Sequence, residues 1–113
     1  PIKYPVIPSV VFTSPRIAKV GISVEDAKKN NDHIQQNQLV DDWYRQVNHE
    51  RISENTLIFD DDHRLIGATE VSEQAANAID TLLPAIEFKF SKEDVSRVIH
   101  LFPSISASTW GLL

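Results

Sequence analysis

The spacing of hydrophobic residues along the chain predicts several short strands. A β-branched and aromatic run that stops before Pro15 predicts a strand over residues 9–13. The clearest signal is a pair of strands over residues 56–59 and 65–71, which flank a polar turn at residues 60–64. Three adjacent aspartates in this turn are easily solvated and do not continue a strand. These segments therefore predict an antiparallel hairpin.

Three serines mark the predicted starts of helices. Ser23 is a predicted N-cap for a helix over residues 24–31. Ser72 is predicted to open a longer helix, in which Pro84 should kink the helix or end its regular hydrogen bonding. Ser91 is predicted to open the last helix.

Each of the last two predicted helices has one hydrophobic face, because apolar residues recur at helical spacing. The longer helix carries Ala75, Ile79, Leu82, Leu83 and Ile86 on this face. The last helix carries Val95, Val98, Ile99 and Phe102, and ends at Pro103.

Residues 32–52 give the weakest signal, and within them Leu39 to Tyr44 is predicted to form a strand. Strands that precede the main helices in this way indicate an α+β fold, with an antiparallel sheet covered by helices on one side. We expect residues 1–113 to form a single domain, because 113 residues divide poorly into two cores.

Composition and charge narrow the classes of function. Net charge is −5 and no cluster of Lys and Arg exists, so nucleic acid and anionic membranes are not expected partners. No apolar run approaches the roughly 18 residues that a membrane span needs. The chain has no cysteine, which excludes disulfides, thiolate zinc sites and a cysteine nucleophile within it. This fits the reducing cytoplasm, where we expect the protein to be.

Metal and nucleotide motifs are also missing from the sequence. The four histidines are His33, His49, His63 and His100. No two of them have the spacing of a helical ligand pair, so no metal site is predicted. The three glycines lie far apart, which excludes a glycine-rich phosphate loop within this chain.

Two stretches together resemble a known domain. Residues 10–21, with the helix start at 23–27, are similar to the opening of the C-terminal dimerisation domain of pyridine-nucleotide-disulfide oxidoreductases. That family includes glutathione reductase, dihydrolipoamide dehydrogenase and mercuric reductase. Residues 59–107 resemble the rest of that domain, and residues 102–107 fall on its His-Pro signature.

The resemblance implies that an FAD domain and an NAD(P) domain precede Pro1 in a longer chain. Such domains pair two subunits, so the expected partner is a second copy. In the dimer, a His and a Glu of each signature complete the partner's active site, and the His moves a proton for the substrate thiol. The redox cysteines of the family belong to the FAD domain. We therefore expect this chain alone to bind no cofactor and to have no catalysis of its own.

The chain departs from the family where the chemistry lies. Phe102 stands at the position of the proton-moving His, and a phenyl ring has no titratable nitrogen. Ala107 stands at the position of the Glu, and its side chain cannot orient a histidine. By resemblance, Phe102 and Pro103 would still lie near the partner's flavin. His100 is a candidate for a displaced base, but two residues along a helix rotate a side chain by roughly 200°, which favours a structural or interface role.

We therefore predict the dimerisation domain of an FAD-dependent NAD(P)H oxidoreductase that is not a standard disulfide reductase. The alternative is a stand-alone, non-catalytic interaction module that has the same fold and no flavin.

Overall fold

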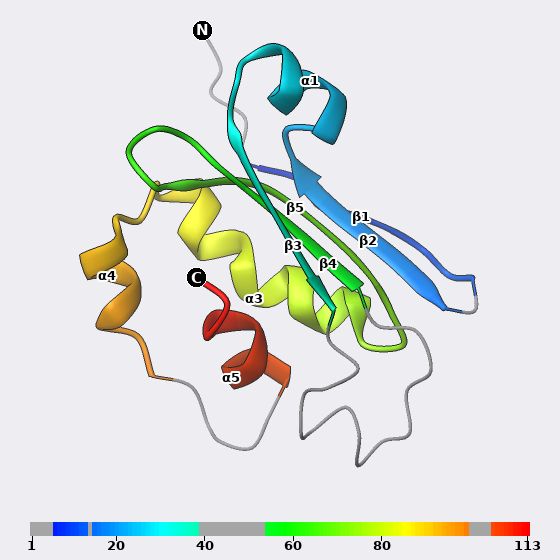
Figure 1. Ribbon diagram of the computed structural model, residues 1–113. Helices are drawn as coiled ribbons and strands as arrows, with labels where there is room; N and C mark the ends of the chain where they lie inside the picture. The colour runs from blue at the N-terminus through cyan, green and yellow to red at the C-terminus, as the bar shows by residue number, and fades with distance from the viewer. Residues whose placement is uncertain (1–5, 14, 39–53, 100–104) are drawn as a thin grey trace, which may run out of the picture.

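The computed structural model describes residues 6–13, 15–38, 54–99 and 105–113 (Figure 1). The strands in these ranges are β1 (Ser9–Val11), β2 (Arg16–Gly21), β3 (His33–Gln38), β4 (Glu54–Phe59) and β5 (Leu65–Ser72). The helices are α1 (Val24–Lys29), α3 (Ala75–Glu87), α4 (Lys92–Ser96) and α5 (Ile105–Trp110).

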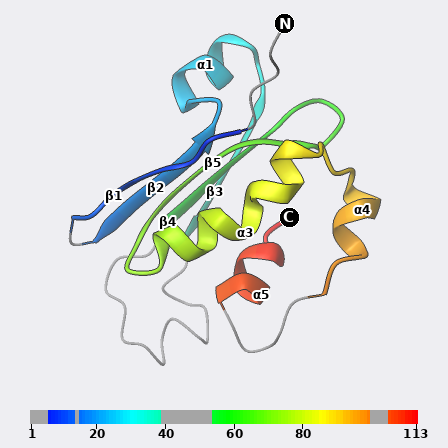
Figure 2. The same cartoon turned by 180° about the vertical axis from the view of Figure 1, so that it is seen from behind.

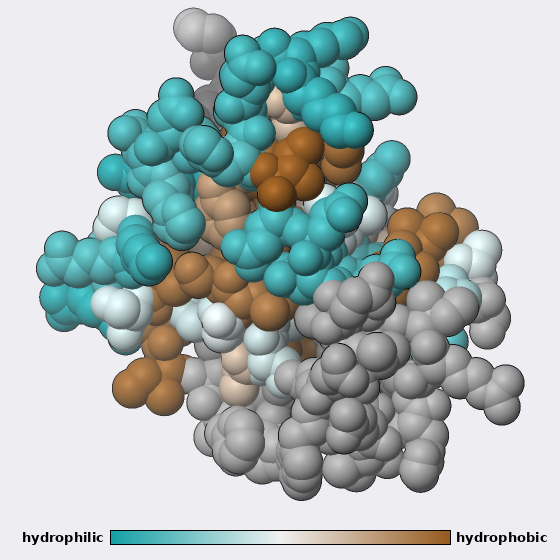
Figure 3. All heavy atoms as spheres, viewed as in Figure 1, coloured by the Kyte–Doolittle hydropathy of each residue, from teal (hydrophilic) through white to brown (hydrophobic). Residues whose placement is uncertain are grey.

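The strands form one five-stranded antiparallel sheet with the order β1-β2-β5-β4-β3. Opposite views show α3 and α5 together on one face of this sheet, with α4 beside them (Figures 1 and 2). The core lies between the sheet and α3, where Leu57, Ala68, Ile79 and Leu82 are buried. Hydrophilic residues cover α1 and the turn between β4 and β5 (Figure 3). The predicted α+β fold is confirmed.

The predicted hairpin is formed by β4 and β5. Its turn is organised by Asp60, whose Oδ1 accepts hydrogen bonds from the backbone N–H groups of Asp62 at 3.0 Å and Arg64 at 2.9 Å. An aspartate that bonds to the backbone ahead of it replaces the ladder bonds of a strand. The same side chain therefore shapes the turn at the end of β4.

Two strands were not evident from the hydrophobic pattern. The predicted strand over residues 9–13 ends at Val11, and β2 begins at Arg16, directly after Pro15. β3 contains one hydrophobic residue, Ile34, so it lacks the alternation that would reveal a strand. The strand predicted over Leu39 to Tyr44 lies outside the described residues.

Ser23 caps α1 as predicted, because its Oγ accepts a hydrogen bond from the backbone N–H of Asp26 at 3.2 Å. The helix ends at Lys29, two residues earlier than expected. Asn31 has a φ of 60°, a left-handed conformation that asparagine tolerates and that stops a helix.

The long helix α3 begins at Ala75, so the prediction that Ser72 opens it is wrong. Ser72 is still part of the sheet and pairs with Arg16 of β2. Its hydroxyl donates to the carboxylate of Glu70 at 2.7 Å. The hydrogen bond to Glu70 therefore keeps Ser72 in the sheet, although its sequence context is that of a helix cap.

Pro84 lies inside α3, and the helix continues past it to Glu87. The predicted hydrophobic face is buried, apart from Leu83, which is half-buried. A proline removes one helical hydrogen bond, and burial of the remaining face against the sheet compensates for that loss.

The prediction that Ser91 opens α4 is confirmed, and the helix begins with a capping box. The Oγ of Ser91 accepts from the N–H of Asp94 at 3.2 Å, and the Oδ2 of Asp94 accepts from the N–H of Ser91 at 2.9 Å. The helix ends at Ser96, however, so its predicted continuation is wrong. Val98 and Ile99 are 36% and 93% exposed, because helical spacing alone does not provide a surface to pack against.

Candidate functional site

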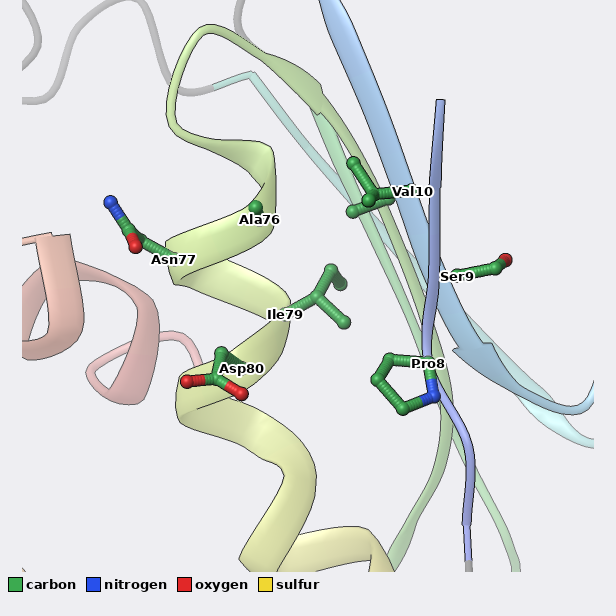
Figure 4. A pocket seen from close by; sticks show the side chains of 8 residues that line it. Pro8, Ser9, Val10, Ala76, Asn77, Ile79 and Asp80 are labelled. Atoms are coloured by element: carbon green, nitrogen blue, oxygen red, sulfur yellow. The ribbon is translucent and has the colours of Figure 1, made fainter. Parts of the chain in front are cut away.

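A groove of about 280 Å³ runs between the edge strand β1 and α3 (Figure 4). It is lined by Pro8, Ser9, Val10, Ala18, Ala76, Asn77, Ile79 and Asp80. Its floor is apolar, and Val10 of β1 and Ile79 of α3 point toward each other across it. Its rim on the helix side is polar, because Asn77 and Asp80 are both exposed.

The groove exists because α3 does not cover the full width of the sheet. α3 packs on β2 and β5, which leaves the outermost strand β1 beside it. Val10 pairs with Ala18 of β2, so both side chains lie on the face toward α3. The other edge of β1 pairs with no described strand. A strand edge without a paired strand, beside an apolar floor, is typical of a surface that receives another chain.

A row of polar side chains crosses the helix-covered face of the sheet. Asn37, Asn55 and Glu70 stand opposite one another on β3, β4 and β5. The Nδ2 of Asn37 donates to the Oδ1 of Asn55 at 3.2 Å, and the Nδ2 of Asn55 donates to the Oε1 of Glu70 at 3.2 Å. Asn55 is 1% exposed and Glu70 is fully buried. These hydrogen bonds offset the cost of removing polar groups from water.

The row extends to both ends of the helix layer. Toward α3, Ser72 bonds Glu70 and its Oγ accepts from the N–H of Gln74 at 3.2 Å. Toward the C-terminus, the Nε2 of Gln35 donates to the Oδ1 of Asn37 at 3.3 Å and to the carbonyl of Leu112 at 3.1 Å. We call the side chains of Gln35, Asn37, Asn55, Glu70 and Ser72 the polar network.

Sequence reasoning did not find the polar network. One signal was available at the hairpin, because Asn55, which directly precedes the predicted strand at 56–59, and Glu70 lie two positions from Leu57 and Ala68 and therefore point to the same face as these buried residues. Two polar residues at inward positions of facing strands indicate a buried hydrogen-bonded pair.

Of the C-terminal signature residues, Ala107 lies within the described part of the chain. It is half-buried in α5, and its carbonyl accepts from the N–H of Gly111 at 3.0 Å. Its methyl group offers no polar atom. His100, Phe102 and Pro103 lie outside the described residues.

Within the described ranges, no three His, Asp or Glu side chains are grouped as metal ligands. His33 and Asp61 approach to 3.3 Å at exposed positions, and His63 stacks on Phe59 with ring centroids 4.6 Å apart. None of the helices in the described part of the chain is long and apolar enough to cross a membrane.

The same antiparallel sheet and helix layer occur in solved structures of longer proteins. LpdA from Mycobacterium tuberculosis matches with a TM-score of 0.83 and 18% identity, over 99% of this chain and 26% of that one. The HOCl-induced flavoprotein disulfide reductase RclA from Escherichia coli matches with a TM-score of 0.82 and 20% identity, over 97% and 27%. At these identities the likeness concerns the fold.

The sequence defines the family. Residues 7–111 match the model of the pyridine nucleotide-disulphide oxidoreductase dimerisation domain, and the chain belongs to this family. The predicted resemblance is thereby confirmed.

Two curated relatives show how the domain occurs elsewhere. An uncharacterized 19.7 kDa protein in the mercuric resistance operon of Staphylococcus aureus is 35% identical over 94% of this chain. A dihydrolipoyl dehydrogenase of Buchnera aphidicola is 32% identical over 91% of it. The chain spans 61% of the first relative and 22% of the second.

Proposed function

We propose that this chain is the homodimerisation domain of a cytoplasmic, FAD-dependent NAD(P)H oxidoreductase. Membership in a family of dimerisation domains is the observation that carries the proposal. We assign the pairing surface to the groove between β1 and α3, because it combines an apolar floor, a polar rim and a strand edge that pairs with no described strand. This combination is typical of interfaces between subunits.

We further propose that the parent enzyme lacks the proton relay of the family. Phe102 and Ala107 replace the two relay residues that the resemblance implies, and neither side chain can accept or hold a proton. Loss of both is coherent, since an orienting carboxylate has no role without its base. Such an enzyme would reduce an acceptor that needs no thiol protonation.

FAD and NAD(P) would be bound by other domains of the parent. A dinucleotide carries a pyrophosphate, which requires backbone N–H groups of a glycine-rich turn or cationic side chains. Among the described residues, the groove is lined by the carboxylate of Asp80 and by no Lys or Arg, and its 280 Å³ is below the usual size of a ligand site. These residues do not fit a dinucleotide.

A stand-alone interaction module is the second candidate. One observation favours it: the Staphylococcus aureus relative has a mass of 19.7 kDa, and this chain accounts for 61% of it. The remainder of that protein is too short to hold two nucleotide-binding domains. Flavin released by denaturing the intact native protein would support the oxidoreductase, and its absence would favour the module.

Sedimentation velocity with three forms of the chain tests the pairing surface. We expect the wild type to be a dimer and Ala76→Arg, with a charge inside the groove, to be a monomer. Gln36→Arg places the same side chain at an exposed position on the opposite edge strand and should remain a dimer. Circular dichroism checks that each variant is folded. A monomeric wild type at high concentration would contradict the proposal.

The missing relay is tested on the intact native protein. We expect NAD(P)H oxidation with a quinone or flavin acceptor, and very slow turnover with glutathione disulfide and lipoamide. Efficient turnover of either disulfide would contradict the loss of the relay.

A further inference from the structure

We infer that the polar network couples the docking of the C-terminal helix α5 to the position of α3. Its two ends contact the segments that hold these helices. Gln35 bonds the carbonyl of Leu112, two residues after α5 ends at Trp110. Ser72 accepts from the N–H of Gln74, the residue that precedes α3. A continuous set of hydrogen bonds across β3, β4 and β5 joins these two contacts.

The direction of the hydrogen bonds makes the network a single unit. The three amides of the network lie between two acceptors, the Leu112 carbonyl and the Glu70 Oε1. The amide nitrogen of Gln35 donates both to Leu112 and to Asn37. The side-chain amide of each Asn then accepts from the preceding residue and donates to the next one. Reversing the amide of Asn55 would point its oxygen at the carboxylate of Glu70. A defect at one link therefore cannot be repaired by flipping the amides beside it.

Burial adds an energetic cost to any defect. Asn55, Glu70 and Ser72 are each at most 1% exposed, so water cannot replace a lost partner without local opening. The two helices also touch directly, since the hydroxyls of Thr81 in α3 and Ser106 in α5 lie 2.9 Å apart. Movement of one helix consequently disturbs polar contacts of the other on two sides.

The coupling reaches the pairing surface through α3. Ala76, Asn77 and Asp80 lie in the first two turns of this helix, directly after the contact of Ser72 with Gln74, and they line the groove. If pairing uses the groove, as proposed above, dimerisation and docking of α5 stabilise one another, because linkage between two equilibria is reciprocal. This last step rests on the proposed function, whereas the coupling within one chain does not.

Native-state hydrogen exchange on the full chain, at a concentration where it is monomeric, tests the coupling. Each substitution is made at one end and read at the other. Gln35→Leu removes the contact with Leu112, and we expect exchange of the Ala78 N–H, which bonds Gln74, to rise by about tenfold. Glu70→Gln keeps the volume, and we expect a rise of about the same factor at the Leu113 N–H, which bonds Trp110.

Ile58→Val provides the matched control. Ile58 is buried in the same strand as Asn55 but is not part of the polar network, so its truncation weakens the domain without breaking the network. Exchange at the two reporter amides should rise no more than exchange of the whole core. The coupling is overturned if, in both network variants, the exchange rate rises only near the substituted residue and not at the reporter amide at the other end.

The link to pairing is measured separately. We expect Gln35→Leu to weaken the dimer by about tenfold, although residue 35 lies on the edge strand opposite β1 and does not line the groove. An unchanged dimerisation constant overturns the link to pairing. A wild-type chain that never pairs overturns the proposed function instead, and the exchange measurements still decide the coupling.

Discussion

Asn55 and Glu70 face each other across β4 and β5, and the Asn55 amide donates to the Glu70 carboxylate at 3.2 Å with both side chains buried. The Glu70 carboxyl group accepts from this amide and from the Ser72 hydroxyl, and these hydrogen bonds replace those it would make to water. Removing either partner leaves the other without that contact inside the core, whereas removing both leaves an apolar pair.

This pair predicts strong non-additivity in stability. We expect Asn55→Leu and Glu70→Leu each to lower the free energy of unfolding by about 1–3 kcal/mol, because each leaves a buried polar group with a lost hydrogen bond. The double variant should lose less than the sum, by about 1 kcal/mol or more. Urea denaturation of the four proteins measures this cycle. Additive losses would show that the two side chains are independent.

Gly67 is predicted to accept no side chain. It pairs with Gly21 of β2, and a Cβ at Gly67 would lie 2.5 Å from the carbonyl oxygen of Ile22 and 2.9 Å from its Cγ2. We expect Gly67→Ala to lower the free energy of unfolding by about 2–4 kcal/mol, since the backbone itself must shift. Gly111→Ala is the control, because its nearest contacts of 3.4 Å are ordinary, and thermal unfolding should find it close to wild type.

Asp94 predicts a pH-dependent contribution to stability. Hydrogen bonds from the backbone and hydroxyl of Ser91 hold the pKa of Asp94 below its ordinary value of 3.8. A carboxyl with a lowered pKa in the folded state contributes stability that is fully present above 3.8 and is lost as the pH falls through the lowered value. Asp94→Asn should therefore have a lower melting temperature than the wild type at neutral pH, and this difference in melting temperature should shrink in acid. A difference in melting temperature that grows in acid would contradict a lowered pKa for Asp94.

Trp110 is predicted to fix α4 against α5. Its Nε1 donates to the carbonyl of Val95 at 2.9 Å, and its ring stands edge-on to Phe90 with centroids 6.3 Å apart. We expect Trp110→Phe to lower the free energy of unfolding by about 1–2 kcal/mol, because the hydrogen bond from Nε1 to the Val95 carbonyl is lost while much of the ring packing remains. Chemical denaturation measures the loss. Phe88→Leu, at a side chain that is 71% exposed, should change little.

Local signals in the sequence were sufficient for the helix caps and for the hairpin. Ser23 and Ser91 bond the backbone three residues ahead, so a short window contains the whole interaction. The turn at Asp60 is equally local. The order of the predicted strands and helices then indicated the layer arrangement, which no short window contains.

Distant contacts account for what the sequence did not reveal. β3 is a strand because β4 supplies its partners, although its own side chains are mostly amides. Ser72 failed as a helix cap because Glu70 and Arg16 hold it in the sheet. The polar network was missed because its members come from three strands, and hydropathy assigns such residues to the surface.

Pro84 affects hydration of the groove between β1 and α3 as well as the geometry of α3. Its ring nitrogen has no hydrogen, so it cannot donate to the carbonyl of Asp80, four residues before it on the groove rim. Asp80 therefore presents two kinds of acceptor at the rim, its side-chain carboxylate and a main-chain carbonyl that receives no hydrogen bond from residue 84. In a single chain solvent can satisfy them, but a copy that closes over the groove must either bring donors to this position or leave it wet. The rim of the groove therefore favours a partner surface that carries amide or hydroxyl groups over a purely apolar one.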